Sequence, residues 1–173
     1  MGTEILNSRD TSKTGFITTS YGDDSIVAGK TGVVVSSMNL SSEQTVNFLI
    51  DMSSVDVDKT VFIFPCLISS SDTRVEFRFY EGTDYSGGTT VTPFNPNRTS
   101  EQTLQTVLTS GATGTDKGDL LPTRNAFANH KDSANSLIYP FLILDKNKKY
   151  IAEFENKEAQ STVIDYSTSI FEV

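Results

Sequence analysis

Residues 73–81 read Thr-Arg-Val-Glu-Phe-Arg-Phe-Tyr-Glu, and this stretch decides the fold class. Val75, Phe77 and Phe79 alternate with polar residues. This period of two is typical of a β-strand that has one face in a core and the other in solvent. A helix would instead repeat its apolar residues every three or four positions. The stretch therefore predicts a half-buried strand.

Similar strand patterns occur on both sides of this stretch. Thr60–Ile68 and Leu137–Leu144 are apolar on both faces, which predicts central strands, and each contains a proline (Pro65 and Pro140) that we expect at a strand edge or a bulge. We expect Lys149–Asn156 and Ser161–Val173 to pair as a C-terminal hairpin. Further strands are predicted at Thr31–Met38, Thr45–Met52, Thr89–Pro93 and Leu104–Ser110.

These strands and the Gly/Asn/Pro-rich loops between them favour an all-β fold. Roughly eight to ten strands at short spacing predict an antiparallel β-sandwich that is jelly-roll-like. Residues 1–30 are polar and rich in Gly and Asp, so we expect an extended or partly ordered N-terminal arm. Residues 31–173 are expected to form a single sandwich domain.

The charge balance argues against nucleic acid as a partner. The chain has 14 Lys and Arg against 22 Asp and Glu, a net charge of −8, and such a surface repels phosphate. No run approaches the roughly 20 apolar residues of a membrane span, so we expect no membrane contact. The N-terminus also lacks the apolar core of a signal peptide.

The residues that could carry chemistry do not form a recognisable constellation. Cys66 and His130 are the single residues of their types. Cys66 lies in an apolar run and His130 in a polar stretch, which disfavours a nucleophile–base pair. Gly29-Lys30-Thr31 lacks the earlier glycine of a phosphate loop and reads as a turn. Gly111–Gly118 reads as a mobile connector. The acidic pairs lack the density of a calcium loop, so we expect no enzyme activity, no metal and no cofactor.

Several blocks together resemble a known group of proteins. They are Val75–Gly82 (VEFRFYEG), Gly88–Ser100 (GTTVTPFNPNRTS), Asp116–Leu121 (DKGDLL), Leu144–Ile151 (LDKNKKYI) and the closing Phe171-Glu172. In this order they resemble the decoration or minor capsid (head-associated) proteins of tailed bacteriophages, over about residues 43–173. The resemblance implies a non-enzymatic structural protein that decorates or stabilises a capsid. It also implies a protein made in the bacterial cytoplasm and located in the virion.

The expected partners are the major capsid protein or other virion proteins, together with further copies of this chain. We expect a homo-oligomer, with a trimer as the first form to test. The alternative is a carbohydrate- or receptor-binding module such as a tail-fibre or head-fibre head domain, with Tyr21, Tyr80, Tyr85 and Tyr139 as a sugar platform. In either case Asn95, Asn97 and Arg98 are the candidate loop-bracing or interface residues, because carboxamides cap turns and a guanidinium offers five donors.

Overall fold

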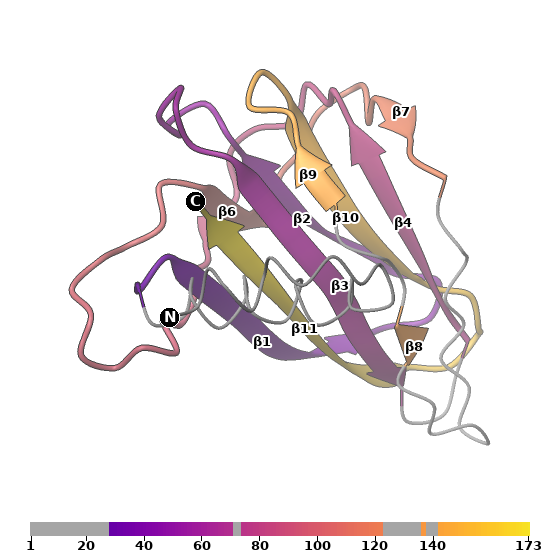
Figure 1. Cartoon of the computed structure of the whole chain (residues 1–173). Coiled ribbons are helices and arrows are strands. Elements are labelled where there is room, and N and C mark those ends of the chain that lie inside the picture. Colours follow the sequence, from indigo (N-terminus) through magenta and orange to yellow (C-terminus); the bar gives the residue numbers. More distant parts are fainter. Residues whose placement is uncertain (1–27, 71–73, 123–135, 138–141) are drawn as a thin grey trace, which may run out of the picture.

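The computed structural model describes residues 28–70, 74–122, 136–137 and 142–173, with the backbone alone at 64–70 and 136–137. The strands of this described part form two antiparallel sheets (Figure 1). Sheet 1 has the order β1 (Thr31–Leu40), β11 (Thr162–Glu172), β3 (Val61–Ser70) and β8 (Ser136–Leu137), with β9 (Leu142–Leu144) also paired to β3. Sheet 2 has the order β5 (Thr89–Thr90), β6 (Val107–Ser110), β2 (Thr45–Asp51), β10 (Lys149–Asn156), β4 (Val75–Glu81) and β7 (Asp119–Leu120).

The strand order is that of a jelly roll. Strands β1 to β4 alternate between the two sheets, and each pairs antiparallel with a strand from the second half of the chain. Thus β1 pairs with β11, β2 with β10, β3 with β9, and β4 with both β10 and β7. This is the arrangement of a long antiparallel hairpin wound around a core. The predicted all-β antiparallel sandwich is confirmed, although the short strands bring the described total to eleven.

The predicted C-terminal hairpin is wrong. β10 lies in sheet 2 between β2 and β4, whereas β11 lies in sheet 1 between β1 and β3. In both strands apolar and polar residues alternate as in any antiparallel sheet, so their sequences do not determine which strands they pair with. Asn156, at the end of β10, fixes the crossing between the sheets. Its side-chain nitrogen donates to the carbonyls of Ser41 (2.9 Å) and Gln160 (2.8 Å).

The core lies between the sheets and is rich in aromatic side chains. Phe154 on β10 and Phe48 on β2 both contact Tyr166 on β11, with ring centroids 5.3 and 4.7 Å apart. Phe77 and Phe79 face the same core, as the alternation predicted. Truncating a fully buried side chain such as Phe154 to alanine is expected to destabilise the fold by about 3–5 kcal/mol.

Pro65 lies at an irregularity in the ladder between β3 and β11. The pairing steps from Leu67–Ser167 to Phe64–Ser169, so two residues of β3 stand opposite one residue of β11. A proline has no N–H for the ladder, and a bulge is where that loss is tolerated. The prediction that Pro65 lies at a bulge is therefore confirmed. Pro140, His130 and the side chain of Cys66 lie outside what the structure describes.

Nearly all of the predicted N-terminal arm, residues 1–27, also lies outside the described residues. Gly29, at its end, has a φ of +72° and belongs to the turn that leads into β1, as the turn interpretation of Gly29-Lys30-Thr31 expected. The described part contains no helix of the length and apolar character needed to cross a membrane.

Candidate functional site

The segment from Thr90 to Thr106 forms the side wall of the sandwich next to the edge strand β1. Val33 and Phe94 exchange two backbone hydrogen bonds of 2.7 Å, which attach the segment to β1. Gly32 allows the close approach, since a Cβ there would lie 2.3 Å from Leu104 Cδ1. This long segment without regular strands is therefore a cover packed on the edge of sheet 1.

Asn95 and Asn97 hold the turn inside this cover. The Asn95 carboxamide nitrogen donates to the carbonyls of Gly29 (3.0 Å) and Gln102 (3.1 Å), and its oxygen accepts from the Asn97 N–H at 2.9 Å. Asn97 Oδ1 then accepts from the N–H and the hydroxyl of Thr99, at 3.1 and 2.8 Å. Asn95 is thus the residue that joins three separate points of the backbone.

Arg98 is placed differently from the two asparagines. Its guanidinium carbon lies 4.8 Å from the centroid of the Phe94 ring, a cation–π arrangement. Among the described residues it donates no hydrogen bond to a loop carbonyl. Phe94 is itself half exposed, at 50%. The three candidate residues therefore lie on one loop, but the carboxamides brace it while Arg98 and Phe94 stack at its surface.

Glu172 attaches the same cover to the last strand. It is 3% exposed, and its carboxylate accepts from the N–H groups of Gln105 (3.0 Å) and Thr106 (2.7 Å) and from the Thr106 hydroxyl (2.7 Å). Lys59 Nζ lies 3.5 Å from the carboxylate and supplies a counter-charge. Glu172 entered the sequence analysis only as part of a closing motif. On β11 it is two residues after the buried Ile170, which places it on the inward face of the strand, but its partners on the cover leave no local signal.

A second buried carboxylate, Glu153, lies on the outer face of sheet 2. It is 2% exposed, and its two oxygens bind Arg78 (3.2 Å) and Lys117. Arg78 also contacts Glu76 at 2.7 Å and Glu155 at 2.8 Å. Because both oxygens of Glu153 are engaged with cations, this carboxylate stabilises the face and is poorly placed to act as a base.

The charges around Glu153 shift the pKa values of their neighbours. Partial burial works to lower the pKa of Arg78, but the charge of Glu76 and the hydrogen bonds to Glu153 and Glu155 leave that pKa above its usual range. The hydrogen bond from Lys157 holds the pKa of Glu155 below its usual value. Both shifts favour the charged forms of Arg78 and Glu155.

The segment predicted to be a mobile connector is anchored. The carboxylate of Asp84 accepts from the N–H groups of Thr115 (3.0 Å) and Asp116 (2.9 Å) and from the Thr115 hydroxyl (2.6 Å). Gly118 has a φ of +80° and packs directly against the Glu81 carbonyl. That prediction is therefore wrong, because a side-chain anchor 31 residues away in sequence leaves no signal in a Gly-rich segment.

The tyrosines of the alternative sugar platform do not form an open surface in the part that is described. Tyr80 and Tyr85 are partly buried against a small cluster of Leu49, Ala112 and Ile151 on the outer face of sheet 2. Tyr21 and Tyr139 lie outside the described residues. No group of three or more metal-binding side chains is found among the described residues.

No family model matches this chain, and no curated protein matches it. Among solved structures, it is similar to the mitogen derived from Yersinia pseudotuberculosis, with 8% identity, 80% of this chain and 84% of that chain covered, and a TM-score of 0.33. It is also similar to the decameric BFDV capsid protein, with 7% identity, 80% and 97% of the two chains covered, and a TM-score of 0.17. Likenesses this weak support no inference about function.

Proposed function

We propose that this protein is a non-enzymatic structural component of a tailed-phage virion that decorates or stabilises the capsid through protein–protein contacts. The observation that supports the proposal best is the apolar outer face of sheet 1. Val35 on β1 is 75% exposed and Ile143 on β9 is 66% exposed. Both point away from the core, since their neighbours Val34 and Leu144 are buried in it.

Some of the other outward positions of sheet 1 are also apolar. Phe171, Phe62 and Ile143 are register partners on three neighbouring strands, β11, β3 and β9. Among the outward positions of β1, β3, β9 and β11 whose side chains are described, Asp165 carries the one formal charge. The described outward positions also include polar residues (Ser37, Asn39, Asp165, Ser167 and Ser169), and Phe171 is itself buried. The exposed apolar side chains of Val35 and Ile143 are therefore the part of this face that suits a protein contact.

The outer face of sheet 2 provides the contrast within the same molecule. It is occupied by the ion pairs around Glu153 and by the segment that Asp84 anchors. Sheet 1 is therefore the face we assign to the contact, and its occupant is an apolar, weakly charged surface of a neighbouring capsid protein. Charged residues are depleted at the centre of such interfaces.

The experiment that tests this role measures the chain in purified particles. We expect it to co-purify with intact virions at a fixed ratio to the major capsid protein. Val35→Lys and Ile143→Lys should each weaken particle binding by about tenfold or more, because a buried lysine would lack a partner. Val57→Lys is the matched control, since Val57 is 92% exposed in the turn between β2 and β3.

Absence of the chain from virions would overturn the virion role. If the chain is present but the control variant weakens binding as much as the two sheet 1 variants, the role stands and the assignment of the face fails. Sedimentation of the free chain tests the expected self-association, and a monomer that also fails to bind particles would contradict the proposal.

A further inference from the structure

Sheet 1 ends on one side at β1, and this edge strand is long (Figure 1). β1 has ten residues, whereas the other outermost strands of the described sheets, β5, β7, β8 and β9, have two or three. A very short edge strand offers little for another chain to pair with. β1 is therefore the described edge at which a further strand could be added.

The main chain of β1 shows which of its groups point out of the sheet. Val33 exchanges two hydrogen bonds of 2.7 Å with Phe94, so its N–H and C=O point away from β11. Residues of an antiparallel strand alternate in this respect, and the register with β11 is unbroken along the whole strand. The N–H and C=O groups that therefore also point out of the sheet belong to Val35, Ser37 and Asn39.

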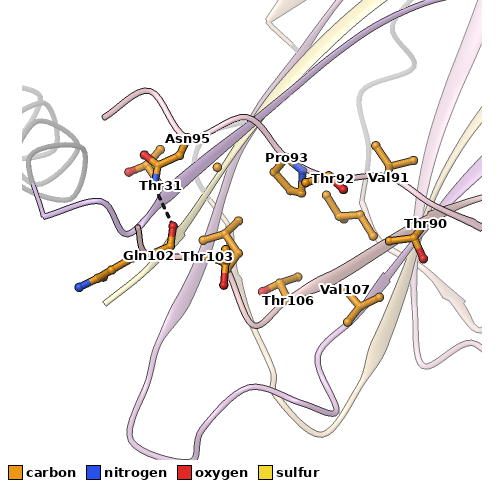
Figure 2. Close-up of a pocket in the computed structure, with 13 residues that line it drawn as sticks. Thr31, Thr90, Val91, Thr92, Pro93, Asn95, Gln102, Thr103, Thr106 and Val107 are labelled. Carbon is orange, nitrogen blue, oxygen red and sulfur yellow. Dashed lines mark hydrogen bonds between the residues drawn. The ribbon is translucent and has the colours of Figure 1, made fainter. Parts of the chain in front are cut away.

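Both ends of this edge are closed, and its middle is open. At the start of β1 the cover closes on the strand, and Figure 2 shows the two arms of the cover around the cavity that they line together with Thr31. Beyond the end of β1, the side chain of Gln44 accepts a hydrogen bond from the Ser41 N–H at 2.8 Å. Between these two points, no residue of the described chain bonds to the three outward pairs of main-chain groups.

The side chains and the sequence of the strand agree with an open edge. Ser36 and Met38 point toward the core as Val34 does, yet both are partly exposed, whereas Val34 beside the cover is buried. Proteins commonly protect an open edge with charged residues, prolines or bulges. Residues 31–42 contain no charged residue and no proline, and the ladder with β11 has no bulge on β1. The edge is thus left able to pair.

We propose that the open edge of β1 pairs antiparallel with the same edge of a second copy of this chain, around a two-fold axis at Ser37. In this register Ser37 lies opposite itself and Val35 lies opposite Asn39, so every open group gains a partner, in about six main-chain hydrogen bonds. A register shifted either way sets an open residue opposite Val33 or Ser41, whose groups are already bonded. The open groups are thus symmetric about Ser37, which favours a second copy over an unrelated strand.

The charges near the edge permit this pairing, although the chain has a net charge of −8. The register partner of Ser37 on β11 is Asp165. In the joined sheet the two copies of Asp165 are three strand spacings apart, about 14 Å, which exceeds the Debye length of about 8 Å at physiological salt. The product is a dimer, in place of the trimer first considered, and the inference does not depend on the virion role.

The test begins with the free full chain. Sedimentation from micromolar to millimolar concentration should show a monomer–dimer equilibrium. Hydrogen exchange followed by NMR should show the amides of Val35, Ser37 and Asn39 protected only as the dimer forms, while the Val33 amide is protected at every concentration. The proposal is wrong if the chain stays monomeric, if the three amides exchange equally fast in the dimer, or if they become protected only on particles, which would assign the edge to another virion protein.

Two charged variants test the two-fold register. In Ser37→Lys and in Ser37→Glu, like charges lie directly opposite each other across the axis, so each variant should dimerise about fivefold more weakly than the parent. An equal mixture of the two should form a heterodimer about tenfold tighter than either variant alone, because opposite charges then meet. Val57→Lys, in the turn between β2 and β3, adds the same charge elsewhere and should dimerise as the parent does. A mixture without this rescue would exclude the axis at Ser37.

Ser37→Pro tests the main-chain pairing itself. It removes an N–H that bonds to no described residue in the single chain, and proline is tolerated at an edge position whose N–H faces solvent. Urea unfolding should therefore show a folded chain, while sedimentation shows that dimerisation is lost. A folded Ser37→Pro that dimerises as the parent does would overturn the proposal, and if this variant does not fold, the charged pair decides.

Discussion

The carboxylate of Glu172 accepts both the main-chain N–H and the hydroxyl of Thr106, each at 2.7 Å. The two residues belong to different layers, because Glu172 ends β11 in sheet 1 and Thr106 leads into β6 in sheet 2. A single buried side chain therefore connects the layers at one end of the sandwich. It also positions the Thr90–Thr106 cover.

Glu172→Ala should reduce the free energy of unfolding by about 2–4 kcal/mol, because two buried N–H groups and one hydroxyl lose their acceptor. Glu172→Gln, which keeps an acceptor oxygen but not the charge opposite Lys59, should fall between that variant and the parent. Urea unfolding measures both. Glu101→Ala, at an exposed position of the same cover, is the control, and an equal loss there would contradict the structural role of Glu172.

Gly118→Ala should destabilise the protein by more than about 2 kcal/mol. The residue has a φ of +80°, and a Cβ would lie 2.1 Å from the Glu81 carbonyl oxygen, so backbone must move. Gly111→Ala is the matched control, with a φ of +72° and nothing within 4 Å of its added Cβ. This control should lose only about 1 kcal/mol of stability, which is the cost of placing a residue with a Cβ in the left-handed conformation. Equal losses would mean that the close approach at Gly118 relaxes freely.

Asp84 should make the stability of the fold sensitive to acid. The hydrogen bonds from the Thr115 side chain and from the Asp116 N–H hold the pKa of Asp84 below its usual value. A lowered folded pKa contributes stability at neutral pH, and that contribution is lost as the pH falls below about 4. In Asp84→Asn the free energy of unfolding should depend less on pH in this range, which unfolding measured from neutral pH to about pH 3 tests.

Thr115→Val serves as the companion to this experiment. It keeps the carboxyl of Asp84 but removes the hydroxyl that donates to it at 2.6 Å. The pKa of Asp84 should then rise toward its usual value, and NMR titration of that carboxyl measures the change directly. An unchanged pKa in this variant would show that the hydroxyl is not the cause of the shift.

How far the sequence predicts this molecule depends on the distance over which each feature is encoded. The alternation of Val75, Phe77 and Phe79 is local, so the strand and its buried face were predictable. The pairing of β10 with β2 and β4 is not local, and the hairpin predicted instead was wrong. Period-two patterns specify a face of a strand but leave the neighbouring strand open.

The polar sites show the same limit more strongly. Glu153 alternates correctly with apolar residues and reads as a solvent-facing carboxylate, yet it is 2% exposed, with Lys117 contacting it from 36 residues away in sequence. Asn95 was a candidate because an asparagine in a Pro-rich loop is a common turn residue. Its two carbonyl partners could not be predicted, since one of them, on Gly29, lies 66 residues away.

Arg98 provides the last prediction, in comparison with Asn95. Because its guanidinium lies over the Phe94 ring at 4.8 Å, and an ammonium can occupy the same place, Arg98→Lys should lower the free energy of unfolding by less than about 0.5 kcal/mol. Asn95→Ala should lower it by about 2 kcal/mol, since three hydrogen bonds are lost. Urea unfolding of both variants shows whether Arg98 holds the loop in place, as Asn95 does, or only stacks on the Phe94 ring at the surface.

The same pair of variants separates a structural role for Arg98 from an interface role. If Arg98 contacts a neighbouring subunit, Arg98→Lys should weaken particle binding and make it more sensitive to salt while the free chain unfolds as the parent does. If Arg98→Lys instead destabilises the free chain as much as Asn95→Ala, the guanidinium braces the loop and the stacked arrangement is not what holds it. Parental unfolding together with parental particle binding would remove Arg98 from the functional surface and leave the bracing of this loop to Asn95 and Asn97.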